Sequence, residues 1–181
     1  MKDIQLYYDY WQHQAENHTL LQHSEAAGSR VFQVIGIEEA LGDFRSGVKK
    51  QDFIFRLIKY YYTVGQPDHR ITKTLNGGFI IAKWYNEQTG GKEAKFAAEV
   101  AAEQVMDQMI EKMIADSKNG HPLFDHSIDS PENFHIQTVE QGGDGNYVGW
   151  MLIYEAEQLF SNCTNPDPAN WLDGGLTPLP A

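Results

Sequence analysis

The stretch DFIFRLIKYYYT, residues 52–63, decides the fold, because its density of aromatic and β-branched side chains predicts a β-strand. Strict alternation divides these side chains between two faces, one with Phe53, Phe55, Leu57 and Lys59, the other with Ile54, Arg56, Ile58 and Tyr60. Both faces are largely apolar. We therefore expect this strand to lie inside a sheet that is covered on both sides for part of the strand's length.

The segments around this strand predict the rest of the sheet. Residues 31–35 form a short apolar run, and FIIAKWY at 79–85 follows a stretch, 65–76, that we expect to be a polar linker. Residues 134–141 and 147–160 alternate in polarity and are joined by a glycine-rich turn, which is typical of a β-hairpin. Together these segments predict a mostly antiparallel sheet of about five strands.

Two longer helices and one short helix, at 37–44, are expected beside the sheet. The segment 92–118 carries an apolar stripe and is long enough to cross a whole sheet, since it would span roughly 40 Å at 1.5 Å per residue. Residues 86–91 before it are expected to form a loop. An N-terminal helix over 3–16 is expected to bury Ile4, Tyr8, Trp11 and Ala15 on one face. The long helix's stripe consists of Ala98, Ala102, Val105, Met109 and Met113.

The order of these segments predicts an α+β fold, because helices are segregated from strand pairs instead of alternating with single strands. We expect one α+β domain over residues 1–160. Residues 161–181 contain four of the seven prolines and are expected to form an irregular C-terminal extension.

Composition and charge indicate which partners the protein is not expected to bind and where in the cell it is expected to be. The formal net charge is −11 and the basic residues are scattered, so we do not expect nucleic-acid binding. No run of apolar residues reaches the length of a membrane span, so no membrane partner is expected. The single cysteine and the absence of an apolar leader at the N-terminus favour a cytoplasmic protein, or a virion-associated one if the chain derives from a phage.

Two groups of side chains could in principle carry chemistry. His121, Asp125, His126 and Asp129 lie in one loop and could gather around a cation, although solvated loops often have this composition. Glu155 and Glu157 share one face of the last strand, about 7 Å apart, which could suit acid–base work but also fits a solvated strand end. Glu38 and Glu39 are a further carboxylate pair.

The remaining candidates lack a supporting motif. Cys163 has no nucleophile signature around it, and Gly90-Gly91 does not form a phosphate-binding loop. Residues 144–146 (DGN) lack the further acids of a calcium loop. The sequence therefore predicts no catalytic, cofactor-binding or metal-binding residue, and it favours a protein that is not an enzyme.

The aromatic side chains favour a protein–protein surface. They lie at Tyr60, Tyr61 and Tyr62, at Trp84-Tyr85, and at Trp150. In an acidic chain with strands this aromatic, part of the sheet is expected to bind another protein. The long strand over 147–160 could also offer an edge to a neighbouring subunit.

A family resemblance points the same way. The stretches EEALGDFRSGVKKQDFIFRLIKYYY (38–62), GGFIIAKWY (77–85) and GDGNYVGWMLIYEAE (143–157), with the long helix between the last two, resemble uncharacterised prophage proteins. These are similar in organisation to small phage tail-terminator or tail-completion proteins. The resemblance covers roughly residues 30–160, implies a homo-oligomeric, ring-forming α+β protein without catalysis, and supplies no functional residue.

The sequence thus leaves two functions open. The first is a non-enzymatic structural or assembly protein, with a phage tail-associated subunit as its specific form. The second is a small-molecule-binding protein or hydrolase-like enzyme with a cleft beside the sheet, which the segment 121–129 and the carboxylates at 155–157 motivate.

Overall fold

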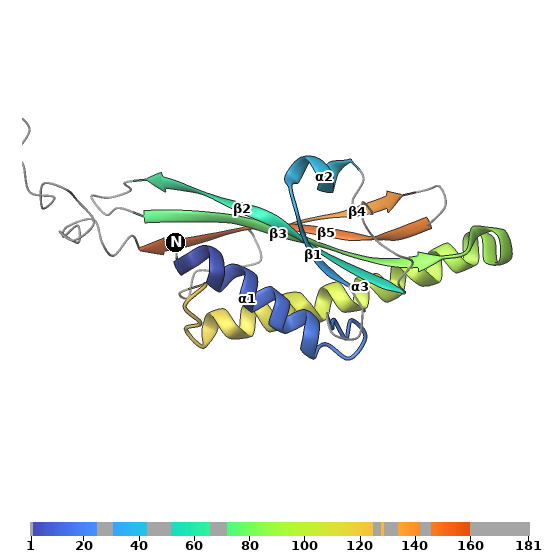
Figure 1. The fold of residues 1–181 in the computed structure, drawn as a ribbon, viewed down its shortest axis with the longest axis horizontal. Helices are drawn as coiled ribbons and strands as arrows, with labels where there is room; N and C mark the ends of the chain where they lie inside the picture. The colour runs from blue at the N-terminus through green and yellow to red at the C-terminus, as the bar shows by residue number, and fades with distance from the viewer. Residues whose placement is uncertain are drawn as a thin grey trace, which may run out of the picture.

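A computed structural model describes residues 2–24, 31–42, 52–65, 72–124, 128, 134–141 and 146–159 (Figure 1). The helices are α1 (Lys2–Asn17), α2 (Ile37–Leu41) and α3 (Glu87–Lys118). The strands are β1 (Phe32–Ile35), β2 (Phe53–Gly65), β3 (Thr72–Tyr85), β4 (Phe134–Gln141) and β5 (Asn146–Leu159). The Pro-rich extension expected at 161–181 lies outside the described residues.

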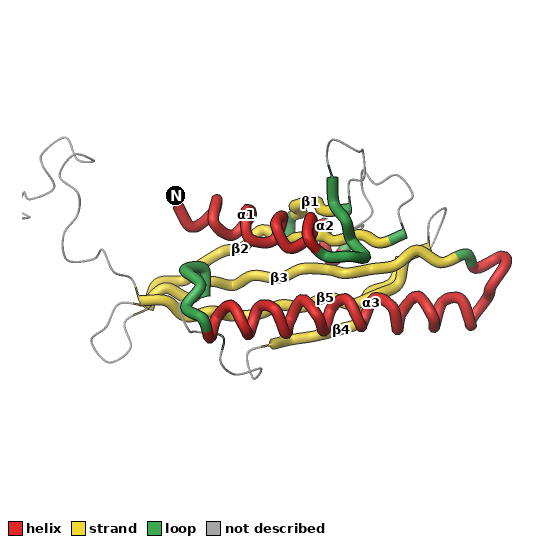
Figure 2. The backbone as a smooth tube through the Cα atoms, turned by 90° about the horizontal axis from the view of Figure 1, so that it is seen from below, coloured by secondary structure: helices red, strands yellow, loops and turns green. Residues whose placement is uncertain are grey.

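The strands form one five-stranded sheet in the order β1-β2-β3-β5-β4. β1 runs parallel to β2, and the other three neighbouring pairs are antiparallel. β2 therefore lies inside the sheet, as its two apolar faces predict. Figures 1 and 2 show α1 and α3 side by side on one face and α2 on the other. The predicted α+β fold, with a long helix across a mostly antiparallel sheet, is confirmed.

The main core lies between the sheet and the α1–α3 layer. All five residues of the predicted α3 stripe are buried, which confirms the face assigned from the helical period; four lie in this core, and Ala98 lies in a small cluster with Tyr85 and Val148. The face predicted for α1 is partly wrong. Trp11 and Ala15 are fully buried, but Tyr7 takes the place expected for Ile4, which remains 44% exposed.

β3 begins at Thr72, seven residues before the predicted Phe79, so the expected polar linker is wrong over 72–76. The reason is visible in Figures 1 and 2, where β2, β3 and β5 extend past the ends of α1 and α3. In this stretch the core contact is made by Leu75, which is fully buried together with its β5 partner Ala156, whereas Thr74 is only partly buried, so the strand does not need a continuous apolar pattern. We call this three-stranded projection, residues 61–65, 72–76 and 155–159, the tongue.

A β-bulge connects the tongue to the body of the sheet. The pairing of β2 with β3 shifts between Ile58 and Tyr61, so that two residues of β2 lie opposite Gly77. The hydroxyl of Tyr7, from α1, inserts at this point. It donates to the Ile58 carbonyl at 2.9 Å and accepts the Gly78 N–H at 3.3 Å. Backbone groups released by the bulge are therefore satisfied by a helix side chain.

The bulge also corrects the alternation expected along β2. Beyond it, Tyr60 packs against Tyr7, with ring centroids 4.8 Å apart, on the α1 side of the sheet and not on the side of Ile58. Gly77 is required opposite the bulge, since a Cβ there would lie 2.9 Å from the Tyr154 ring. The extra residue in β2 thus changes the face of every following side chain.

α3 begins at Glu87, so the loop expected over residues 86–91 is wrong. Asn86 caps this helix, because its side-chain oxygen accepts hydrogen bonds from the N–H groups of Gln88 and Thr89. Gly91 then interrupts the helix with φ 52° and ψ −141°, a backbone conformation that favours glycine. The predicted glycine boundary is therefore a kink inside the helix.

Candidate functional site

An open groove of about 870 Å³ lies where α1 passes the C-terminal end of α3. α1 contributes most of its lining, and α3 and the residue after its C-terminal turn supply the rest. The polar lining residues include Asp9, His13, Glu16, Lys112, Asp116 and His121. A groove lined in this way could accept a small polar molecule, so it is the first candidate site.

Tyr10 and Asp116 form the centre of the groove. The buried Tyr10 hydroxyl donates to Asp116 Oδ2 at 2.9 Å, while Lys112 pairs with Asp116 Oδ1 one helical turn away. Burial, with Asp116 as the second cause, raises the pKa of Tyr10 well above its usual range. Tyr10 is therefore a fixed neutral donor, and Lys112 compensates the carboxylate charge that this donor faces.

His121 closes one end of the groove. Its ring packs on Tyr10 with centroids 4.8 Å apart, and its Nδ1 accepts the Leu123 N–H at 3.2 Å. Because Nδ1 is an acceptor, the neutral ring carries its proton on Nε2. Burial lowers the pKa of His121 below 6.5, and the nearby Asp116 opposes that shift.

This environment predicts how stability depends on pH. Because the folded-state pKa of His121 lies below the unfolded value of 6.5, folding favours the neutral ring. The stability that His121 contributes is complete above pH 6.5 and is lost as pH falls through the folded-state pKa. Between about pH 8 and about pH 5, we expect the free energy of unfolding to fall more steeply in the wild type than in His121→Gln. Parallel profiles in urea titrations, or an NMR pKa of 6.5 or above, would contradict this.

The structure brings together few of the other candidates proposed from the sequence. Asp125, His126, Asp129 and Cys163 lie outside the described residues, as do Asp144 and Gly145. Among the residues that are described, no three His, Cys, Asp or Glu side chains are placed to hold a metal ion. The predicted carboxylate pair is not resolved as a site: Glu155 is exposed, and the side chain of Glu157 is not described. Glu38 and Glu39 lie in the first turn of α2.

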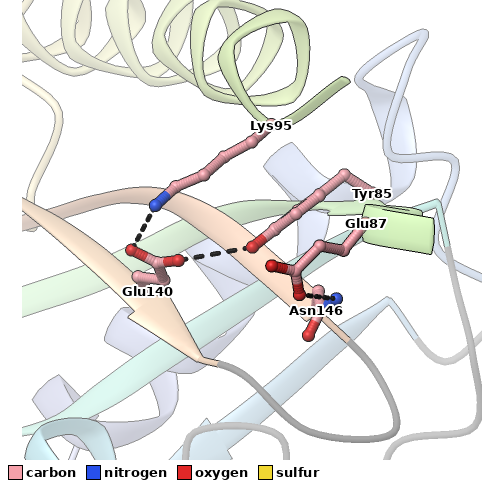
Figure 3. A network of polar contacts seen from close by, with 5 residues as sticks. All are labelled: Tyr85, Glu87, Lys95, Glu140 and Asn146. Atoms are coloured by element: carbon pink, nitrogen blue, oxygen red, sulfur yellow. Dashed lines mark hydrogen bonds and ion pairs between the residues drawn. The ribbon is translucent and has the colours of Figure 1, made fainter. Parts of the chain in front are cut away.

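A second polar network fastens the beginning of α3 to the β4–β5 hairpin (Figure 3). Glu140 accepts from Lys95 Nζ at 2.5 Å and from the Tyr85 hydroxyl at 3.3 Å. Asn146 donates to Glu87 at 3.2 Å close by. Each of these bonds joins α3, or the strand end before it, to β4 or β5, so we assign the network a structural role.

Arg56 is a notable residue whose environment the strand pattern did not reveal. It is fully buried, and its Nη1 donates to the Val31 carbonyl at 2.9 Å. Burial lowers the pKa of Arg56 to about 10, against the opposing effect of Tyr147 and Glu39. A lone arginine within DFIFRLI was the available signal, because a charge in a doubly covered strand needs polar partners.

Of the aromatic residues expected at a protein–protein surface, some are buried or half-buried and others are exposed. Tyr85 is buried, and the half-buried Trp150 donates from Nε1 to the Glu99 carbonyl of α3 at 3.3 Å. Tyr61 and Tyr62, by contrast, are 65% and 52% exposed on the tongue, where Val64 is 56% exposed. The tongue is therefore the second candidate site, and it offers large side chains on both faces of one strand.

Comparisons with known proteins add no family to this description. No protein-family model, no curated protein and no solved structure matches the chain. Among the described helices, none combines the length and the apolar character needed to cross a membrane.

Proposed function

We propose that the protein is a non-enzymatic structural component that assembles with copies of itself, of the kind found in phage tails. The observation that carries the proposal is the tongue, with Tyr61, Tyr62 and Val64 more than half exposed. Large apolar side chains grouped on a projecting strand are characteristic of protein–protein contacts. The resemblance to prophage proteins supports the tail-associated form, and a virion or the bacterial cytoplasm is the corresponding location.

Self-association is the direct test of this proposal. Sedimentation velocity and light scattering of the full chain, from about 1 µM to about 100 µM, are expected to show an oligomer that grows with concentration. A mass that stays at 20.6 kDa throughout would overturn the proposal. An oligomer that persists at about 0.5 M salt would further indicate that apolar contacts dominate, because surface charges are screened there.

The groove beside α1 favours a second candidate, the binding of a small polar molecule. Tyr10 and Asp116 are bonded to each other, whereas Asp9 and Glu16, which line the same opening, accept hydrogen bonds from the neutral amides of Gln5 and Gln12. Asp116 is paired with Lys112, so the two remaining carboxylates of the lining, those of Asp9 and Glu16, favour a cationic ligand such as a polyamine. Titration with spermidine, followed by NMR, should then shift resonances of Tyr10 and His121. Unchanged resonances at millimolar ligand would remove this candidate.

A further inference from the structure

The tongue has two outer strands whose flanks are uncovered by any described strand. β1 pairs with β2 only over Phe55–Ile58, whereas β2 continues to Gly65. On the other side, β4 reaches β5 only as far as Tyr154, whereas β5 continues to Leu159. Within the tongue, β3 residues 72–76 pair with residues 61–65 on one side and with residues 155–159 on the other. These two segments are therefore the outer strands of the tongue.

Geometry excludes one way of joining two tongues. If a second copy had the same orientation, its β5 would lie along the outer side of β2 in the first copy. The first copy's β1 and the second copy's β4 would then need to occupy the same gap, because each flanks the body of its own sheet. Neighbouring strands are only about 4.8 Å apart, so this arrangement has no room. Two copies can pair their tongues only in opposite directions, with their bodies at opposite ends.

Charge distinguishes the remaining arrangements. The chain has a net charge of −11, so two copies repel one another and a contact without acidic residues is favoured. The β5 segment 155–159 contains Glu155 and Glu157, whereas the β2 segment 61–65, YYTVG, contains no charged residue. Pairing β5 with itself would bring carboxylates together. Pairing β2 with β5 would place them beside tyrosine, threonine and valine.

We propose that two copies of this chain join through the outer edges of β2, antiparallel, about a two-fold axis at Thr63. The proposal rests on the function proposed above and names its partner surface. It joins two five-stranded sheets into one continuous sheet, with the α1–α3 layers of both copies on the same face.

The segment is self-complementary in this register. Tyr62 of each copy lies opposite Val64 of the other, which gives two aromatic–β-branched pairs. Thr63 lies opposite its own copy, and cross-strand threonine pairs are also favourable. Tyr61 lies opposite Gly65, where the ring can cover a glycine that has no side chain. Tyr61 and Tyr62 are on opposite faces of the strand, so both faces of the tongue gain contacts.

A cysteine at the axis tests the register. In a Cys163→Ser background, Thr63→Cys is expected to form a covalent dimer on mild oxidation or with a short bis-maleimide, because both thiols meet at the two-fold axis. Ile136→Cys is the matched control, since it is a 47% exposed residue of β4, the opposite edge strand. Equal cross-linking of the two variants, or none at residue 63 in a chain that self-associates, would overturn the proposal.

Charge insertion tests the energetics of the same contact. Val64→Glu is expected to weaken self-association by about tenfold or more, since it replaces a cross-strand valine with a carboxylate in both copies. Ile136→Glu and Phe96→Glu, at exposed apolar positions elsewhere, should leave association unchanged. If the wild type associates but Val64→Glu has no effect, the contact lies elsewhere and only this proposal fails. A wild type that never associates contradicts the proposed function itself.

Discussion

Gly149→Ala is expected to be among the most damaging single substitutions in the protein. Gly149 lies in β5 opposite Ala82 of β3 and Val139 of β4, so its backbone is paired on both sides. A Cβ at this position would lie 2.1 Å from the Ile81 carbonyl oxygen and 2.6 Å from the Ala82 Cα. Both atoms belong to the backbone of β3, which cannot move aside as a side chain can.

The expected cost is about 3 kcal/mol or more of unfolding free energy, at the upper end of the range for overpacking. Urea titrations followed by circular dichroism measure it directly. Gly36→Ala is the matched control, because nothing lies within 4 Å of the added Cβ and its φ of −75° suits alanine. A Gly149→Ala variant that stays within about 1 kcal/mol of the Gly36→Ala variant would show that β3 and β5 are not so closely paired.

Trp11→Ala is expected to have a comparable effect through the opposite mechanism, a cavity. The Trp11 ring lies between α1 and the sheet, 4.5 Å from Phe79 and 5.9 Å from Phe55 between centroids. Its Nε1 donates to the Tyr154 hydroxyl at 3.3 Å, a buried bond that the substitution also removes. Removing a buried tryptophan costs about 3–5 kcal/mol, enough to detach α1 from the sheet in a domain of ordinary stability.

The same helix provides the control for this prediction. Ile4→Ala is expected to change the unfolding free energy by less than about 0.5 kcal/mol, because Ile4 is 44% exposed. Chemical denaturation of both variants separates the two possible apolar faces of α1. Similar losses for Ile4 and Trp11 would support the face expected from sequence periodicity and contradict the one in the structure.

Much of the fold could be predicted because it depends on local periodicity. The α3 stripe from Ala98 to Met113 is regular over four turns, so its buried face follows from the helical repeat alone. In β5 the alternation of Leu152, Tyr154 and Ala156 identified the face that packs in the main core. Both patterns are long enough that individual exceptions do not alter the result.

The bulge could not be predicted, because it is a property of a strand pair. Only the register between β2 and β3 shows that two residues of β2 lie opposite Gly77. The same reason explains why Tyr60 was expected on the wrong face. The start of β3 was predicted too late because residues 72–76 are mostly polar, a composition typical of a linker. In the structure this stretch pairs with β2 and β5, and its apolar residue Leu75 packs into the core.

The candidate sites, too, could be predicted from the sequence only in part. Tyr10 and Asp116 are 106 residues apart in sequence, and neither belongs to a recognisable motif, so the groove follows from the packing of α1 beside α3. The tyrosines of β2 were expected at a protein–protein surface from composition alone. Which of the aromatic residues are exposed depends on where the helices end relative to the strands, and sequence periodicity carries no information about that.

The attachment of α1 has a consequence for the order of folding. Its Tyr7 bonds with backbone 51 and 71 residues away, and its Trp11 bonds with a tyrosine 143 residues away. During synthesis α1 is therefore made long before β5, the last strand that completes its binding surface. Contacts between such distant segments form slowly, because a long loop must close before they contribute. Until β5 is made and paired, the tyrosine and tryptophan side chains of α1 lack the surface that buries them, so this helix is expected to dock late in folding.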